Sequence, residues 1–244
     1  FPELDAEARE ALLRRHYRVT GQAAMDLGLI WWGSRRRLER LVTFIGMEPV
    51  LERLERGENI IVLTGHFVGA DFGGIYSSRN TDGIVMMKEM PNELFNWFVW
   101  RGRTRFGAEV TLRRDGLRPL LKALRNHRPC YYVPDEDFGP EISVFVPFFG
   151  IPTATITTLG RLAAAARAVV VPCWTRLQPD GRYEIEFGAA FEDYPSGNEE
   201  ADAARMSLAI EEGIRKAPEQ YMWTLKWFRS RPGGEPPPYD RPAP

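Results

Sequence analysis

The sequence predicts a single α/β domain in which a central mixed, mostly parallel sheet is flanked by helices and preceded by an N-terminal helical segment. The chain has 244 residues, of which 44% are hydrophobic and 27% charged, so it is long and apolar enough to bury a large core. From residue 59 onward, short apolar runs alternate with segments of helical spacing, which is the pattern of repeated βαβ units. No stretch has the composition of a linker between domains.

The first 55 residues are expected to form two or three amphipathic helices that pack on the core or on a membrane surface. Apolar residues recur there at helical spacing, among them Leu38, Leu41, Val42 and Ile45. The α/β core is expected over residues 56–231. Residues 232–244 are too rich in proline for a core element and are expected to drape over the surface as a tail.

Within the core, each short apolar run is interpreted as a strand and each longer run of helical spacing as a helix. Strands are predicted at residues 59–64, 83–88, 108–112, 129–133, 169–175 and 182–188. Helices are predicted at residues 68–78, 92–105, 115–126, 157–167 and 200–216. The third helix tolerates Pro119 because the first turn of a helix has no partners for its N–H groups.

Charge is balanced overall but uneven along the chain. The net charge of -1 argues against a globally basic nucleic-acid binder. Arginines cluster at residues 35–40, 101–105 and 113–114, which suits phosphates or an acidic partner. For the first cluster, a solvated helix face is the alternative interpretation.

Neither a disulfide nor a metal site is expected. Cys130 and Cys173 lie in separate apolar strand-like runs without a neighbouring His, which favours structural roles in a reducing, cytosol-facing setting. The three histidines, His16, His66 and His127, form no cluster with the spacing of metal ligands. No metal cofactor is therefore predicted.

The membrane signals are mixed. No run of eighteen apolar residues is present, and because the chain starts at Phe1 and not at Met, we expect that an N-terminal anchor is missing from it. Trp31 and Trp32 precede the arginines at 35–37, a combination that suits a membrane–water interface. Helix residues that pack into the protein core would give the same pattern, and this remains the alternative interpretation.

The candidate catalytic base is His66, which follows the strand predicted at 59–64. Asp71 comes five residues later, and Gly65 permits a bend that keeps His66 just outside the first helical turn, within reach of that carboxylate. The helix N-terminus is expected to favour a neutral imidazole and to offer backbone N–H groups to an oxyanion. Such a site would deprotonate a hydroxyl. The alternative is a structural histidine, since this spacing also occurs by chance.

A second group of acidic residues is expected on the same rim of the sheet. Asp135 and Asp137 directly follow the strand predicted at 129–133, and ligands bind open α/β sheets at the carboxyl ends of parallel strands. An ordinary polar turn is the alternative. The apolar run at 144–151, with Phe145 and Phe148, is the candidate wall of an apolar pocket.

Two further groups are candidates for substrate binding. Arg101 and Arg103 end an aromatic-rich helix, and arginine binds phosphate in a bidentate geometry, although such clusters are often surface decoration. Thr157 belongs to a set of threonines that leads into the helix predicted at 157–167. Its hydroxyl is expected either to cap that helix or to donate to a ligand.

These segments together resemble the late acyltransferases of bacterial lipid A biosynthesis over residues 60–239. The resemblance rests on Gly65-His66 with Asp71 and on Arg101-Gly102-Arg103. Longer matching blocks are YVPDEDFGP at 132–140, SVFVPFFG at 143–150 and APEQYMW at 217–223. The glycerolipid acyltransferases share the histidine motif, but their Pro-Glu-Gly-Thr-Arg block is absent here, which argues against a glycerol-3-phosphate substrate.

The resemblance implies a glycerolipid-acyltransferase-like fold held by one N-terminal helix on the cytoplasmic face of the inner membrane of a Gram-negative bacterium. It implies transfer of a fatty acyl chain from acyl carrier protein to a hydroxyl of a Kdo-bearing lipid A precursor, with no cofactor besides that acyl donor. His66 would be the general base, Asp71 its orienting partner, and Arg103 the phosphate or oxyanion contact. Two alternatives remain open: a different glycolipid or hydroxylated lipid acceptor, and a non-catalytic, membrane-peripheral lipid-binding module.

Overall fold

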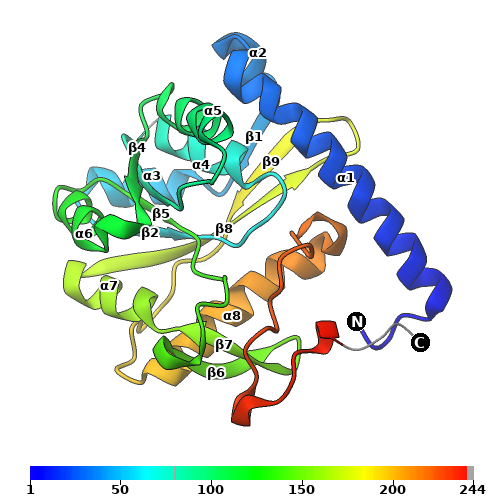
Figure 1. Ribbon diagram of the computed structural model, residues 1–244. Coiled ribbons are helices and arrows are strands. Elements are labelled where there is room, and N and C mark those ends of the chain that lie inside the picture. Colours follow the sequence, from blue (N-terminus) through cyan, green and yellow to red (C-terminus); the bar gives the residue numbers. More distant parts are fainter. Residues whose placement is uncertain (80, 241–244) are drawn as a thin grey trace.

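A seven-stranded sheet forms the centre of the computed structural model, which describes residues 1–79 and 81–240 (Figure 1). The strand order is β1-β9-β8-β2-β5-β3-β4. Strands β8, β2, β5, β3 and β4 are parallel to one another, while β9 is antiparallel to β8 and β1 is parallel to β9. The predicted mixed, mostly parallel sheet is confirmed. The strands span Val42–Ile45 (β1), Asn59–Leu63 (β2), Ile84–Met87 (β3), Glu109–Leu112 (β4), Cys130–Tyr132 (β5), Ala168–Leu177 (β8) and Tyr183–Phe187 (β9).

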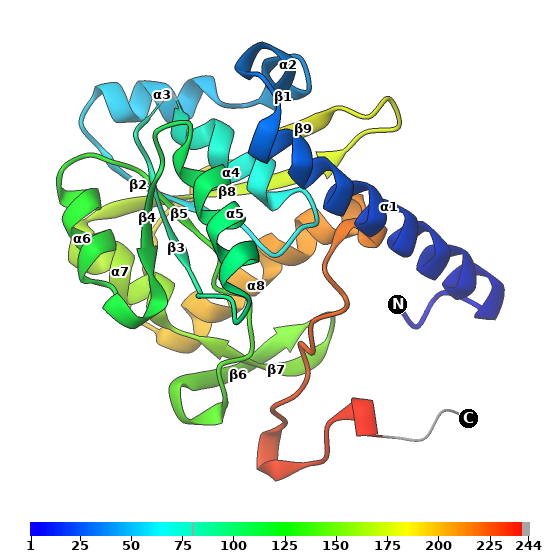
Figure 2. The same ribbon diagram turned by 45° about the horizontal axis from the view of Figure 1, so that its top comes forward.

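Helices cover both faces of this sheet (Figure 2). The described helices are α1 (Ala6–Trp32), α2 (Arg35–Glu39), α3 (Glu48–Glu55), α4 (Ala70–Arg79), α5 (Glu93–Thr104), α6 (Arg118–Arg125), α7 (Thr158–Ala166) and α8 (Glu199–Lys216). One apolar core joins the sheet to α6, α7 and α8, and a second joins its other face to α1, α3, α4 and α5. In the described residues, no helix is both long and apolar enough to cross a bilayer.

The alternation of side chains along each strand explains why the core strands are apolar throughout. In β2, Ile60 and Val62 belong to the core beneath α4 and α5, whereas Ile61 and Leu63 belong to the core beneath α6 to α8. Successive side chains of a strand point to opposite faces, so a sheet covered on both sides needs an unbroken apolar run. All six predicted core strands are confirmed within a few residues of their expected ends.

The prediction of helices throughout the first 55 residues was wrong at Val42–Ile45, which forms strand β1. This strand pairs in parallel with β9, placing Val42 opposite Tyr183. A four-residue apolar run fits a helix or a strand equally well, so its state is decided by the sheet edge that it completes. The N-terminal segment therefore supplies part of the sheet as well as helices.

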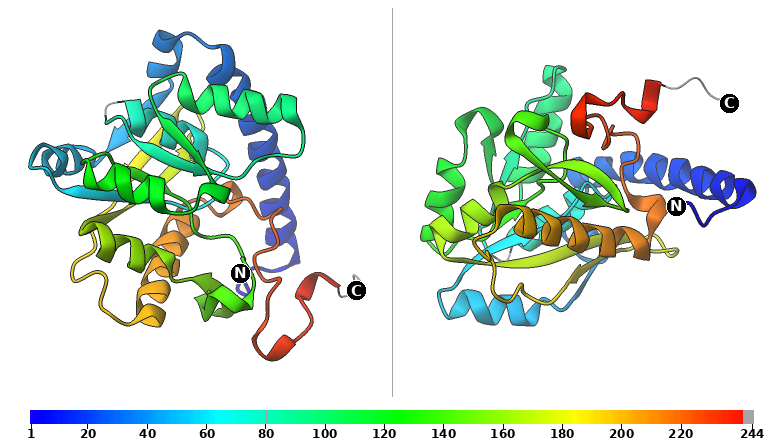
Figure 3. Two further views of the ribbon diagram at one scale, coloured as in Figure 1. Left: turned by 60° about the vertical axis from the view of Figure 1, so that its left-hand side comes forward. Right: turned by 90° about the horizontal axis from the view of Figure 1, so that it is seen from below.

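A separate two-stranded hairpin joins β6 (Ser143–Phe148) to β7 (Ile151–Ile156) and packs on α8 (Figure 3). Most of β6 belongs to the apolar run at 144–151, for which the sequence analysis predicted no strand. Pro147 lies opposite Pro152 in this two-stranded pair, where every strand is an edge strand and proline is tolerated. Phe149 and Gly150 at the turn have φ values of 50° and 74°, so the tight turn uses left-handed backbone.

Candidate active site

His66 and Asp135 emerge at the same rim of the sheet from neighbouring strands. Strands β2 and β5 are parallel, with Leu63 opposite Tyr132, and the Thr64 N–H donates to the Tyr132 carbonyl just beyond them. The chain continues from these strand ends to His66 and to Asp135. The expectation that both groups share one rim is therefore confirmed, and the cause is the parallel register.

Asp135 holds the imidazole in one orientation. The Nδ1 of His66 lies 2.6 Å from Oδ1 of Asp135, and the His66 backbone N–H donates to Oδ2 at 2.7 Å. Because an ionised carboxylate only accepts hydrogen bonds, Nδ1 must carry the proton. The second ring nitrogen, Nε2, is then left as the basic atom of the neutral tautomer. The Asp135 side chain is 4% exposed and the His66 side chain 27%, so the base is accessible and its partner is enclosed.

The orienting role that the sequence assigned to Asp71 belongs to Asp135 in the structure. Asp71 lies in the first turn of α4 and instead accepts a hydrogen bond from Nε of Arg103 at 2.7 Å. His66 precedes α4 by four residues, in a loop that runs between β2 and the helix. At that position His66 is within reach of Asp135, which follows the adjacent strand β5. Residue spacing within the segment from His66 to Asp71 could not reveal this partner.

The backbone around His66 also differs from expectation. The N–H groups of His66, Phe67, Val68 and Ala70 donate to Asp135, Gly65, Gln220 and Phe67, respectively. These groups are therefore occupied by the protein itself. The prediction that a helix N-terminus at His66 supplies oxyanion donors is wrong, because that helix starts four residues later.

The electrostatic surroundings raise the pKa of His66 above its ordinary value. Burial alone lowers this pKa, and the charge of Arg103 lowers it further, but the negative charge and hydrogen bond of Asp135, helped by Glu136, outweigh both. The expectation that a helix dipole would lower the pKa of His66 is therefore wrong. Burial raises the pKa of Asp135, yet the His66 charge and three hydrogen bonds bring it below the ordinary value. These two shifts both favour the pair of imidazolium and carboxylate over the pair of neutral groups.

A C-terminal segment secures this pair from the other side. The Tyr221 hydroxyl donates to Oδ2 of Asp135 at 2.7 Å, and Tyr221 is fully buried. The backbone of this segment is tied to the histidine loop, since Val68 N–H donates to Gln220 and Met222 N–H donates to His66. In the sequence, Tyr221 stands out only as part of the APEQYMW block. A buried tyrosine needs a partner for its hydroxyl, but the sequence does not say which one.

Glu136 and Arg113 form a second polar pair beside the base. Glu136 Oε1 lies 3.8 Å from Nε2 of His66, and its other oxygen accepts from Arg113 at 2.6 Å. The Arg113 guanidinium also lies over the Phe138 ring at 4.6 Å. The sequence had placed Arg113 in a cationic cluster without linking it to this rim.

A cavity of about 760 Å³ opens beside His66. Its inner part is walled by buried side chains between the sheet and helices α4 and α5, including Val85, Val99, Ala108 and Tyr131. Its outer part is lined by residues of α1, of the β3–α5 loop and of the segment after β5. The wall is mostly apolar, and the charged side chains that reach it include those of Asp71, Arg103, Arg113 and Glu136.

The wall predicted from residues 144–151 is wrong, because none of them lines the cavity. Phe148 is buried in the core against Tyr221 and Phe228, and Phe145 lies half-buried in the hairpin. The flanking residues Ile142 and Ile156 line the cavity instead. The hairpin packs on α8, and its Phe148 contacts Tyr221, the residue that donates to Asp135.

Three other predicted binding residues lie outside the cavity wall. Arg101 is exposed and stacks over the Trp97 ring at 5.6 Å. Asp137 accepts from the backbone and hydroxyl of Ser230, so it anchors the C-terminal segment. Thr157 is buried at the start of α7 and makes no side-chain capping bond. Of the two arginines predicted to bind substrate, Arg103 reaches the cavity.

Thiol chemistry is not indicated at the site. Cys130 and Cys173 are free and fully buried in strands, and neither lines the cavity. Burial raises the pKa of Cys130 to about 12, which keeps the thiol protonated. Among residues 1–79 and 81–240, no three His, Cys, Asp or Glu side chains gather as metal ligands would.

The fold and site define the class of protein: an α/β protein with a histidine–carboxylate pair at the rim of the sheet, open to an apolar cavity. The family model of the bacterial lipid A biosynthesis acyltransferases matches residues 1–230, and the chain belongs to this family. It is 35% identical over 239 residues to a lipid A biosynthesis acyltransferase of Haemophilus influenzae, covering 96% of this chain and 74% of that protein.

Two proteins of Escherichia coli K12 show a similar likeness. A lipid A biosynthesis lauroyltransferase is 32% identical, with 97% of this chain and 78% of that protein covered. A lipid A biosynthesis myristoyltransferase is 31% identical, with 99% and 75% covered. The family resemblance noted from the motifs is confirmed, and an acyltransferase activity is supported.

Proposed function

We propose that this protein transfers a fatty acyl chain from an acyl carrier protein thioester to a hydroxyl of a Kdo-bearing lipid A precursor, with His66 as the general base. The observation that carries the proposal is the imidazole whose Nδ1 is held by buried Asp135 and whose ring lines a largely apolar cavity. Together with the family, this arrangement favours catalysis over the alternative of a passive lipid-binding module.

In the proposed reaction, Nε2 of His66 removes the proton of the acceptor hydroxyl as its oxygen attacks the thioester carbonyl. A carbon–oxygen bond forms, and negative charge gathers on the carbonyl oxygen. Collapse of this intermediate breaks the carbon–sulfur bond, and the imidazolium returns the proton to the departing thiolate. Arg103, which lines the cavity and is held by Asp71, is the proposed contact for the oxyanion or for a lipid phosphate. Asp71 acts in this scheme by positioning Arg103.

The cavity and its charges fit these substrates. A volume of about 760 Å³ falls within the range of pockets that bind small molecules, and the inner wall suits a fatty acyl chain. Arg103 and Arg113 lie at the polar end, where lipid phosphates or an acidic carrier protein would approach. On the family resemblance, we place the protein on the cytoplasmic face of the inner membrane of a Gram-negative bacterium.

The acceptor can be tested directly with labelled acyl carrier protein. We expect product with a Kdo-bearing lipid A precursor and little with the same precursor lacking Kdo, with glycerol-3-phosphate or with a lysophospholipid. Matched reactions with acyl-CoA test the donor. Product found only with acceptors other than the lipid A precursor would overturn the substrate assignment while leaving acyltransferase activity intact.

Acyl-chain length is expected to depend on Ala108, a lining residue just before β4 and so at the end of the sheet opposite the rim that carries His66. We therefore assign it to the inner end of the cavity. Ala108 is 6% exposed and lies among the buried lining residues, so Ala108→Leu fills space that the end of a long chain would occupy. One methylene changes pocket binding by about 1–3 kcal/mol, so we expect the longest accepted donors to lose about 10- to 200-fold in kcat/KM relative to shorter ones.

The matched control is Ala24→Leu, which adds the same atoms at an exposed lining position on α1. Competition assays with mixed acyl donors measure the preference in each variant. An unchanged chain-length preference in a folded Ala108→Leu protein would contradict this assignment of the inner end.

A further inference from the structure

Helix α5 and the end of α1 expose large apolar side chains on one face. Trp32, Leu94, Trp97 and Trp100 are 62%, 64%, 52% and 37% exposed, respectively. Single exposed apolar residues are normal on protein surfaces, but several together mark an interaction site. We call this set, together with Trp31, the aromatic face.

Ring contacts hold these side chains in place. Trp31 stacks on Phe98 with centroids 4.9 Å apart, and Trp32 meets both rings edge-on. The rings of Trp97 and Phe98 are also in edge-on contact, with centroids 5.0 Å apart. The left view of Figure 3 shows α5 lying across α1, and the contacts of Phe98 with Trp31 and Trp32 join the aromatic side chains of the two helices. A packed set of aromatics loses little conformational entropy when it binds a surface.

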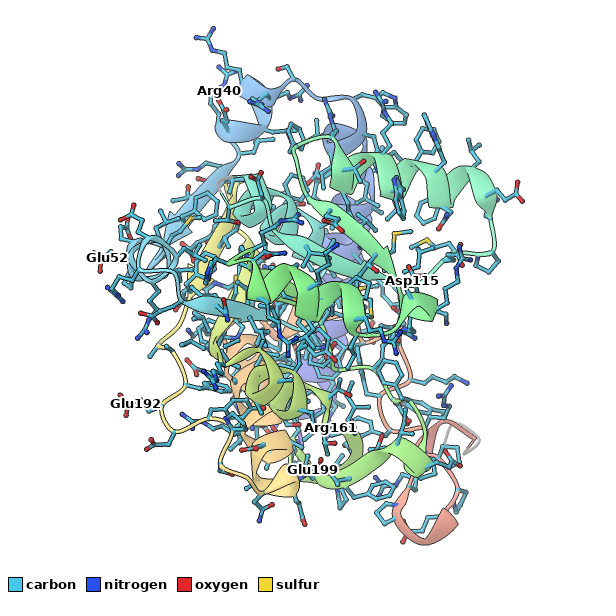
Figure 4. The ribbon with its side chains drawn as sticks, turned by 90° about the vertical axis from the view of Figure 1, so that its left-hand side faces the viewer. Arg40, Glu52, Asp115, Arg161, Glu192 and Glu199 are labelled. Carbon is cyan, nitrogen blue, oxygen red and sulfur yellow. The ribbon has the colours of Figure 1, made fainter. Side chains whose placement is uncertain are left out.

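Arginines border the aromatic face. Arg35, Arg36, Arg37 and Arg40 are exposed at the end of α1 that carries Trp32, with one glutamate among them, and Figure 4 shows Arg40 projecting at that end of the molecule. Arg101 is exposed on α5 over Trp97. The whole chain has a net charge of -1, so this concentration of positive charge is local. Aromatic rings edged by arginine match an anionic headgroup layer.

The aromatic face is continuous with the mouth of the cavity. Phe95 contacts Trp31 at 5.9 Å between ring centroids and also lines the cavity, as do Met90 and Pro91 just before α5. A surface that binds lipid through this face would therefore meet the opening that leads to His66. A second protein bound there would instead cover that opening.

We propose that the aromatic face and its arginines dock the protein onto an anionic lipid bilayer, with the cavity mouth facing the headgroups. The inference rests on the proposed function, since a lipid acceptor would then reach the base without leaving the bilayer. It identifies Trp97 and Trp100 as insertion residues and Arg36 and Arg37 as headgroup contacts.

The test uses co-sedimentation of the protein with vesicles of phosphatidylethanolamine and phosphatidylglycerol, compared with pure phosphatidylcholine. We expect Trp97→Ser/Trp100→Ser to reduce binding to the anionic vesicles by about tenfold or more. Arg36→Glu/Arg37→Glu should lose about fivefold per arginine on anionic vesicles only. Circular dichroism checks that each variant is folded, which we expect because these side chains are exposed.

Matched controls change the same kinds of residue elsewhere. Leu208→Ser removes a 61% exposed apolar side chain on α8, and Arg15→Glu/Arg18→Glu inverts two exposed charges in the first half of α1. Both should bind vesicles as the unaltered protein does. Equal binding by all variants, or loss of binding in the controls alone, would overturn the proposal.

Two further readouts separate this inference from the proposed function. Acyl transfer to a detergent-dispersed acceptor should be unchanged in the Trp97→Ser/Trp100→Ser variant, because neither residue lines the cavity. In the unaltered protein, activity in detergent without vesicle binding overturns the docking face alone, while vesicle binding without acyl transfer overturns the function alone. Light scattering tests for a second copy: a dimer that the tryptophan substitutions dissociate, with vesicle binding unaffected, would assign the face to self-association.

Discussion

Replacing His66 with Ala is expected to lower acyl transfer by about 10²- to 10⁴-fold, the usual contribution of a general base. The loss follows because the Asp135 hydrogen bond occupies Nδ1 and leaves Nε2 as the basic atom of a ring that lines the cavity. Initial rates with labelled acyl carrier protein measure the effect. Binding of the acyl donor, followed separately by equilibrium methods, should persist.

Two companion variants make this result interpretable. His66→Ala removes the partner of an enclosed carboxylate, so His66→Asn, whose amide can still donate toward Asp135, tests loss of the base with less disturbance of the fold. His127→Asn is the control, since His127 is exposed, outside the cavity wall and in a left-handed conformation that Asn tolerates. Activity of either folded His66 variant equal to that of the unaltered protein would retire His66 as the base.

The second large effect is expected at Asp135. Asp135→Asn removes the charge that stabilises the imidazolium and allows the ring to turn or adopt the other tautomer, so kcat/KM should fall by about 10²- to 10⁴-fold. Asp71→Asn should also reduce activity, because it releases Arg103, but without altering the orientation of the imidazole.

The pH profile distinguishes these two carboxylates. The pKa of His66 is raised, so in the unaltered protein kcat/KM should rise as pH increases through a value above 6.5, where the ring loses its proton. Without the Asp135 charge, burial lowers that pKa, and the acidic limb of the Asp135→Asn profile should move to lower pH. A shifted limb in Asp71→Asn, with none in Asp135→Asn, would return the orienting role to Asp71.

Local sequence patterns were sufficient for the secondary structure of the core and for the family. Unbroken apolar runs such as Ile60 to Leu63 identify strands buried on both faces, and the segments between them have helical spacing. Where a run is short, the pattern is ambiguous. Val42–Ile45 completes a helical stripe or an edge strand equally well, and its pairing with β9 decides the outcome.

The sequence was sufficient to predict where the candidate site lies, but not which of its residues contact one another. His66 and Asp135 each follow an apolar strand, so the rim could be predicted, whereas the partner of the imidazole was assigned to the wrong carboxylate. The apolar run 144–151 was likewise taken for a cavity wall, although it packs on α8. Hydrophobicity shows that a segment is buried, but it does not show which neighbour covers it.

Residue order determined the strands, the helices and the set of polar side chains delivered to one edge of the sheet. Three hydrogen bonds were decided only by the tertiary structure: Nδ1 of His66 to Asp135, Arg103 to Asp71, and the Tyr221 hydroxyl to Asp135. The physical reason is the range of the interactions. Periodicity records which way a side chain points within its own segment, whereas a hydrogen bond at 2.6 Å depends on the register of strands that lie 69 residues apart in the chain.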